Sequence, residues 1–268
     1  MIPTNRKLAL SKQAESIAKE FTKNNVTLLT DIADYEDLFV YFDDYENAFE
    51  GMLLYDNKNF HIHINTKNEN TENLKRNRFT FAHELGHYFI DEHRLGLKYN
   101  ILEPHSSFHN LGRKDRIELE ADYFASCLLM PKEKFRIAPV QKKFSFSKIL
   151  EFSELFQTSV LATLIRFAEV GTHEIFAVFV KDNIVKWYVK SDEFPNWKMN
   201  FEVHKQPPKN TVVADFFSKK VKCTEVEEMS ADYWFKPPES DYRADKTMKE
   251  QCYYSDAYGY VISLIWFD

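Results

Sequence analysis

The sequence predicts an α+β protein with a mainly helical N-terminal part and a β-rich C-terminal part. Apolar residues recur at helical spacing in several segments before residue 170, whereas the runs after His173 have the shorter period of strands. Among the first helices, two strand-like runs flank a turn and predict a small antiparallel sheet. We therefore predict an N-terminal domain over residues 1–132, a helical linker over 133–170 and a C-terminal α+β domain over 171–268.

The N-terminal domain is expected to combine amphipathic helices with one hairpin. In its first helix, Leu10, Ala14 and Ala18 fall on one face. The segment Asp56-Asn57-Lys58 has turn chemistry, and the polar run 66–73 supplies candidate N-caps for the helix that follows. In chain order, the expected elements are helices over about 8–23 and 30–38, strands at 51–55 and 59–65, and helices over about 71–91 and 116–130.

The remaining elements follow a polar connection over residues 94–113. Pro131 ends the preceding helix, because proline cannot continue a helical hydrogen-bond ladder. Two short helices are expected within 144–170, with a turn near Gln157. Beyond Gly171 we predict a hairpin around Lys181-Asp182 and further strands at 211–217 and 258–267.

Composition excludes several classes of protein. The net charge of −6 argues against nucleic-acid binding, which needs a surplus of Lys and Arg, and no apolar window is long enough for a membrane span. The N-terminus has no secretory signal pattern. Three widely spaced cysteines, Cys127, Cys223 and Cys252, indicate mainly buried thiols in a reducing compartment. We therefore expect a soluble cytoplasmic protein.

The segment His83-Glu84-Leu85-Gly86-His87 carries the clearest chemistry. Each helical residue turns by about 100°, so two histidines four apart share one face and can bind one metal ion. Glu84 then lies on the adjacent flank, where a general base beside the metal is needed. The sequence predicts a metal site with His83 and His87 as ligands and Glu84 as the catalytic residue.

The third ligand has two main candidates. His93 stands ten residues after His83, as in metzincins, but Ile90 occupies the place of the glycine that turns the chain there, so His93 is expected to be solvated. Glu118 is preferred, because it lies on the inward face of the 116–130 helix and a buried carboxylate needs a partner. Asp122, one turn further, can accept a hydrogen bond from a ligating histidine. Glu120 is expected to point outward.

These motifs resemble the ImmA/IrrE metallopeptidases. The resemblance rests on Arg78 to His87 and on Glu118-Leu119-Glu120-Ala121-Asp122 through Pro131, and it is strong over about residues 50–131. It implies a zincin-like metallopeptidase domain in which His83, His87 and Glu118 bind Zn²⁺, with Mn²⁺ as an alternative, and Glu84 is catalytic. It also implies that the substrate is a helix-turn-helix transcriptional repressor, whose cleavage derepresses genes of a mobile element or stress response. In some members the C-terminal domain is sensor-like.

The alternative function is a non-proteolytic binding protein that sequesters a repressor or acts as a toxin/antitoxin-type partner. An intact Glu84 favours the peptidase, since a binder has no use for a general base. The 144–170 helices carry Lys148 and Arg166 against three glutamates, so we interpret them as a linker or docking element without DNA contacts. The oligomeric state stays open.

Several secondary features also stay open. An oxyanion stabiliser is required, and its candidates are Tyr88, Tyr99, His105 and His109. His61 and His63 alternate onto one strand face, which we interpret as solvated. The strand at 59–65 is a candidate edge for an extended substrate.

Overall fold

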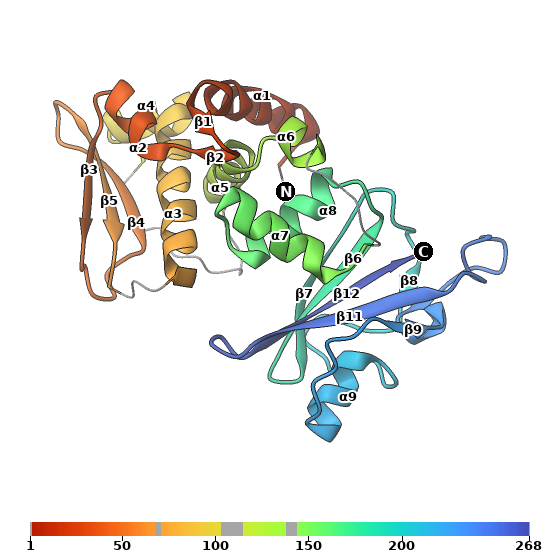
Figure 1. The fold of residues 1–268 in the computed structure, drawn as a ribbon. Coiled ribbons are helices and arrows are strands. Elements are labelled where there is room, and N and C mark those ends of the chain that lie inside the picture. The colour runs from red at the N-terminus through yellow and green to blue at the C-terminus, as the bar shows by residue number, and fades with distance from the viewer. Residues whose placement is uncertain (1, 68–70, 103–114, 138–143, 268) are drawn as a thin grey trace. The chain divides into compact units, whose positions relative to one another are not determined.

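The computed structural model describes residues 2–67, 71–102, 115–137 and 144–267, with the side chains of 71–73 excepted. The chain forms two compact units, and each is described separately (Figure 1). The first comprises residues 1–138 and 152–163, and the second comprises 139–151 and 164–268. None of the described helices is long and apolar enough to cross a membrane.

The first unit contains a small sheet and a group of helices. The elements of this unit are α1 (Thr4–Phe21), β1 (Thr22–Lys23), β2 (Val26–Thr27), α2 (Leu29–Tyr35), β3 (Phe39–Asp43), β4 (Gly51–Tyr55), β5 (Phe60–Asn65), α3 (Thr71–Phe89), α4 (Asp91–Lys98), α5 (Arg116–Leu129) and α6 (Lys132–Ile137). The predicted hairpin is confirmed, since β4 and β5 pair in antiparallel fashion.

The sheet of the first unit is mixed, so the prediction of a purely antiparallel sheet is wrong. Its order is β3-β5-β4, and β3 runs parallel to β5. The β3 strand was missed because it is an edge strand with little burial, so its sequence lacks the alternation of a half-buried strand. The candidate N-caps at residues 68–70 lie outside the described residues.

Helix α3 packs both on the sheet and on α5 (Figure 1). Ile62 and Ile64 of β5 are buried, as expected from alternation along the strand. At Gly86, a methyl group would lie 3.2 Å from the carbonyl oxygen of Ala121, which is tighter than ordinary contact, so glycine favours this close approach of α5 to α3. This close approach brings the two helices that carry the predicted ligands together.

The helix pair consists of α7 (Phe146–Phe156) and α8 (Val160–Val170), with Gln157 at positive φ in the turn, as predicted. Within the first unit, the ring of Phe135 on α6 packs against Phe152 and Phe156, with centroids 4.7 and 5.3 Å away. Aromatic burial therefore holds the C-terminal half of α7 to α6.

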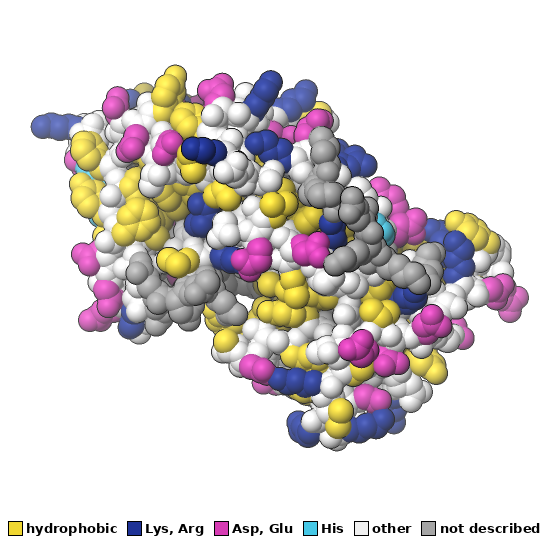
Figure 2. All heavy atoms as spheres, viewed as in Figure 1, with side chains coloured by type: hydrophobic (Ala, Val, Ile, Leu, Met, Phe, Trp, Pro, Cys, Tyr) yellow, Lys and Arg dark blue, Asp and Glu magenta, His cyan; other side chains and the backbone are white. Residues whose placement is uncertain are grey.

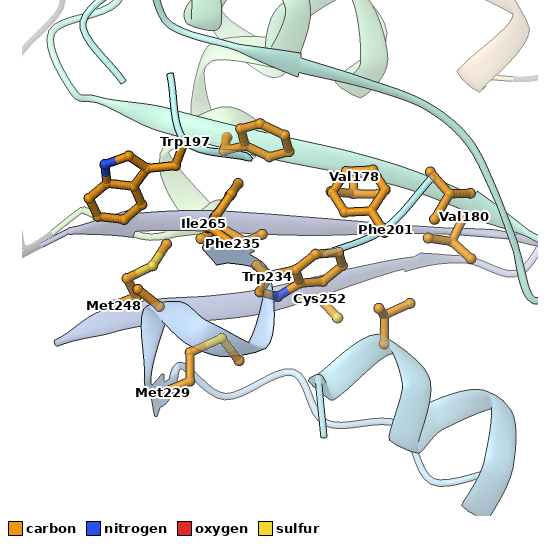
Figure 3. Close-up of a cluster of buried hydrophobic side chains, with 14 of the residues drawn as sticks. Val178, Val180, Trp197, Phe201, Met229, Trp234, Phe235, Met248, Cys252 and Ile265 are labelled. Atoms are coloured by element: carbon orange, nitrogen blue, oxygen red, sulfur yellow. The ribbon is translucent and has the colours of Figure 1, made fainter. Parts of the chain in front are cut away.

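The second unit is built on a five-stranded antiparallel sheet, in the order β7-β6-β12-β11-β9. Its core includes Trp197, Trp234 and Phe235, whose side chains gather on one side of this sheet (Figure 3). Its further elements are β6 (Ile175–Lys181), β7 (Ile184–Lys190), β8 (Lys198–Met199), α9 (Val212–Lys219), β9 (Glu227–Met229), η1 (Ala231–Tyr233), β10 (Phe235–Lys236), β11 (Met248–Ser255) and β12 (Tyr260–Phe267).

Two of the three C-terminal predictions are confirmed. The hairpin turns at Asp182 and Asn183, both at positive φ, and β12 covers most of 258–267. The strand predicted at 211–217 is wrong, because this segment is helix α9. The hydroxyl of Thr211 caps it by accepting from the amide of Ala214, and the buried carboxylate of Glu250 accepts from the amides of Val212 and Val213. A partner from β11 thus overrides the β-propensity of two valines.

Charged side chains of both signs lie on the surface, and two of the three cysteines are buried. Lys, Arg, Asp and Glu are interspersed over the face in Figure 2, with no continuous basic stripe there. Cys127 and Cys252 are buried and Cys223 is partly exposed, and none of the three forms a disulfide.

Candidate metal centre

Two buried histidines on α3 face each other. His83 and His87 are one turn apart, their ring centroids are 4.7 Å apart, and their Nε2 atoms are 3.0 Å apart. Glu84, between them in sequence, is also buried and is close enough for its charge to raise the pKa of His83. Leu85 and Ala82 bury the apolar face of the same helix, which fixes the direction of the histidines.

Glu118 on α5 completes a three-residue group. Its Oε2 lies 3.4 Å from Nε2 of His83, and its Oε1 lies 3.3 Å from Nε2 of His87. A tetrahedral ion with bonds of about 2.0–2.2 Å spaces its ligand atoms by about 3.4 Å, so the three side chains fit such an ion. Among the described residues, this is the one group of three His, Cys, Asp or Glu side chains with ligand atoms converging this closely.

Asp122 accepts a hydrogen bond from the second ring nitrogen of His83. Nδ1–H of His83 donates to Oδ1 of Asp122 at 2.9 Å, which leaves Nε2 turned toward Glu118. Burial alone would lower the pKa of His83, but hydrogen bonds to Asp122 and Glu118 raise it to about 10. For His87, burial outweighs the Glu118 hydrogen bond and lowers the pKa to about 3. The carboxylates of Asp122 and Glu118 therefore favour an additional proton on His83 when no metal is bound.

We expect metal binding to release this proton and to strengthen as pH rises. An imidazole must be neutral to act as a ligand, and His83 stays protonated in the metal-free protein up to about pH 10. Affinity should then rise by about tenfold per pH unit below that value, because one proton leaves per ion bound. Calorimetry at pH 7 in buffers of different ionisation enthalpy measures the released protons directly.

The matched control for this experiment is Asp122→Asn. Losing the Asp122 charge lowers the pKa of His83, so proton release should begin to decline at a lower pH than in the wild type. His83 loses its oriented partner as well, which typically weakens metal affinity by about 10–100-fold. The same pH profile of proton release in both proteins would contradict the assigned proton.

His93 and Glu120 differ from their predictions. The α3 helix ends at Phe89, and Ile90 adopts an extended conformation (φ −78°, ψ 106°) without the left-handed turn that would need glycine. His93 therefore lies on a separate helix, α4, where it is 2% exposed and its ring centroid is 5.1 Å from that of His87. It is not solvated, and it does not belong to the converging group.

Glu120 points into the protein, with 3% exposure, so its predicted outward orientation is wrong. The guanidinium of Arg6 on α1 donates to its Oε2 at 2.8 Å, and Arg116 donates to its Oε1 at 2.8 Å. Nε2 of His93 lies 3.6 Å from Oε2. Helix α1 covers this side of α5, and the periodicity of α5 alone gives no sign of that cover.

The four candidates for the oxyanion stabiliser lie in different surroundings. The hydroxyl of Tyr88 donates to Glu36 at 3.2 Å, and Tyr99 is 65% exposed at the end of α4. His105 and His109 lie outside the described residues.

The remaining sequence candidates have partners of their own. His63 lies 2.8 Å from the hydroxyl of Tyr45, and His61 lies 3.0 Å from Asp56. In the helix pair, Arg166 is buried and pairs with Glu169 at 3.0 Å. This supports the interpretation of that pair as a structural element.

Sequence reasoning missed Gly51, which lies at the start of β4 against Glu84. A methyl group at Gly51 would come within 2.7 Å of Oε1 of Glu84. The available signal was a glycine at the start of a predicted strand, since such a glycine often marks the close approach of another group.

A pair of histidines and a glutamate, with a second glutamate beside them, is the side-chain set of a metallopeptidase, and comparison with known proteins supports that class. Residues 33–168, just over half of the chain, match the family model of the IrrE N-terminal-like domain. The chain belongs to this family of metallopeptidases, as the ImmA/IrrE resemblance predicted.

One relative supports this assignment, and one solved structure resembles the fold. The metallopeptidase ImmA of Bacillus subtilis (strain 168) is 28% identical over 187 residues, covering 66% of this chain and 99% of that protein. A transcriptional regulator of Mycobacterium tuberculosis has a similar structure, with a TM-score of 0.58 and 13% identity, covering 97% of this chain and 76% of that chain. At that identity, the likeness concerns the fold alone.

Proposed function

We propose that the protein is a zinc-dependent endopeptidase of zincin-like fold that cleaves a helix-turn-helix repressor and so derepresses the genes under its control. The observation that carries this proposal is the convergence of His83, His87 and Glu118 within 4.8 Å of one another beside the buried Glu84. Membership of a metallopeptidase family supports the reaction class. The cytoplasm is the proposed compartment, since the three cysteines form no disulfide.

His83, His87 and Glu118 would hold the ion. A bound Zn²⁺ supplies Lewis-acid chemistry, polarising the scissile carbonyl and making water more acidic, and Mn²⁺ is the alternative ion. Glu84 takes the proton from the attacking water and delivers it to the leaving amine. Burial of Glu84 and both histidines excludes bulk water, which strengthens these electrostatic interactions.

The substrate edge that we propose is β4. The β5 strand, our candidate from the sequence, is paired on both sides, with β3 and with β4, so it offers no edge. Of the two outer strands, β4 is the one whose residue Gly51 packs against Glu84. An extended substrate segment adding to β4 would therefore pass beside the general base.

Cleavage of a repressor by this protein is expected to depend on metal. The test is incubation of the purified protein with the product of its neighbouring repressor gene, followed by mass spectrometry of fragments. A chelator should abolish the fragments, and added Zn²⁺ should restore them. Stable association without fragments, unchanged by chelator, would instead support the binding protein and contradict the peptidase.

A further inference from the structure

Gly51 makes unusually close contact with α3 for a reason other than backbone conformation. It is buried at the start of β4, and its φ is not positive, so other residues could adopt this conformation. Glycine is favoured here because the neighbouring side chains leave no room for a Cβ atom. A methyl group at this position would lie 2.4 Å from Cγ2 of Thr80 and 2.7 Å from Oε1 of Glu84, well inside the normal carbon contact distance of about 3.5–4.0 Å.

Thr80 cannot yield freely, whereas the Glu84 carboxylate is the far end of a flexible side chain that a methyl group at residue 51 would push aside. Thr80 is buried, and its hydroxyl donates to the carbonyl of Arg76 at 3.2 Å, while its β-branched side chain has few rotamers. Glu84 lies one turn further along α3 and is also buried. The backbone of Gly51, the first residue of β4, therefore lies directly against the Glu84 carboxylate and limits its position on that side.

The backbone at the start of β4 is held by contacts with both β5 and α3. Gly51 is paired with Ile64 of β5, and the amide of Asn65 donates to the carbonyl of Glu50 at 3.0 Å. The side chain of Glu50 accepts from Nε of Arg76 on α3 at 3.2 Å. Because these contacts hold the start of β4 to both β5 and α3, the strand is not free to move away from α3 when residue 51 carries a larger side chain.

We propose that Gly51 is a positioning residue for Glu84. Because glycine has no side chain, the β4 backbone lies against the Glu84 carboxylate and sets the position of that carboxylate relative to His83 and His87. This inference rests on the proposed role of Glu84. A general base must be within hydrogen-bond reach of the proton that it takes, and a displacement of about 1 Å can cost about 100-fold in rate. A side chain at residue 51 would displace the carboxylate while leaving the three ligand side chains untouched.

The test separates the Thr80 contact from the Glu84 contact with three variants: Gly51→Ala, Thr80→Ser and both together. Thr80→Ser removes Cγ2 but keeps the hydroxyl, so the double variant relieves the packing overlap and leaves only the contact with Glu84. We expect Thr80→Ser to behave as wild type. The double variant should fold and bind Zn²⁺ normally, with kcat on a fluorescence-quenched peptide about 10–100-fold lower and KM unchanged.

A second readout is independent of turnover. In zinc-loaded protein labelled with 13C at the glutamate carboxyls, the Glu84 resonance is identified by its loss in Glu84→Gln. Its chemical shift should change in the double variant relative to Thr80→Ser. Wild-type kcat and an unmoved Glu84 resonance in the double variant would overturn the proposal. That outcome would leave the proposed peptidase function intact, because Glu84→Gln and the chelator test it separately.

Discussion

Replacing Glu118 by alanine is expected to remove the bound metal, whereas replacing His93 by alanine is expected to retain it. Glu118 supplies two oxygens at 3.3 and 3.4 Å from the two histidine nitrogens, and no other carboxylate among the described residues joins that group. Loss of a direct ligand should exceed the roughly 10–100-fold loss in affinity caused by removing an outer hydrogen-bond partner.

Metal content after dialysis, measured by atomic emission, compares the two variants directly. His93→Ala is the matched control, because His93 is as buried as His83 and His87 and lies against His87 without converging on the same point. Full occupancy in Glu118→Ala would mean that the ion is held elsewhere, and the peptidase proposal would lose its basis. Loss of metal in His93→Ala alone would return the third-ligand role to His93.

Replacing Glu84 by glutamine is expected to abolish hydrolysis without loss of metal. The amide keeps the size of the side chain but cannot take a proton, so the rate should fall by at least the ~10²–10⁴-fold typical of general acid–base catalysis. Single-turnover cleavage of the repressor, together with metal analysis of the same sample, measures both quantities. A variant that binds Zn²⁺ normally and still cleaves at the wild-type rate would remove Glu84 from the mechanism.

Glu84→Gln should also separate cleavage from substrate binding. Because Glu84 contributes a proton transfer rather than a binding contact in this mechanism, the variant should still associate with the repressor. Native mass spectrometry or calorimetry of that complex reports the association. Failure to associate would indicate a binding role for Glu84 that the mechanism does not include.

The local pattern of the sequence predicted the parts of the site that depend on helical spacing. His83 and His87 are four residues apart, as are Glu118 and Asp122, so each pair shares a helix face whatever the surrounding fold. The hairpin at β4 and β5 and the helix pair at α7 and α8 were likewise predicted, because turn chemistry and hydrophobic period are short-range properties.

Long-range contacts decided the rest. Whether Glu120 faces inward depends on Arg6, which is 114 residues away in sequence, and the helical form of 212–219 depends on Glu250 from another element. The edge strand β3 leaves a weak local signal because most of it is exposed, and the break at Ile90 is marked by no glycine or proline.

The sequence by itself therefore determined which residues could form a metal site and which glutamate could act beside it. Only the tertiary structure decided that α5 meets α3 at Gly86, that β5 lies inside the sheet while β4 is one of its two outer strands, and that Gly51 lies against Glu84. The physical reason is that spacing along one helix is fixed by its own backbone, whereas the approach of two elements is set by the volume and charge of side chains far apart in the chain.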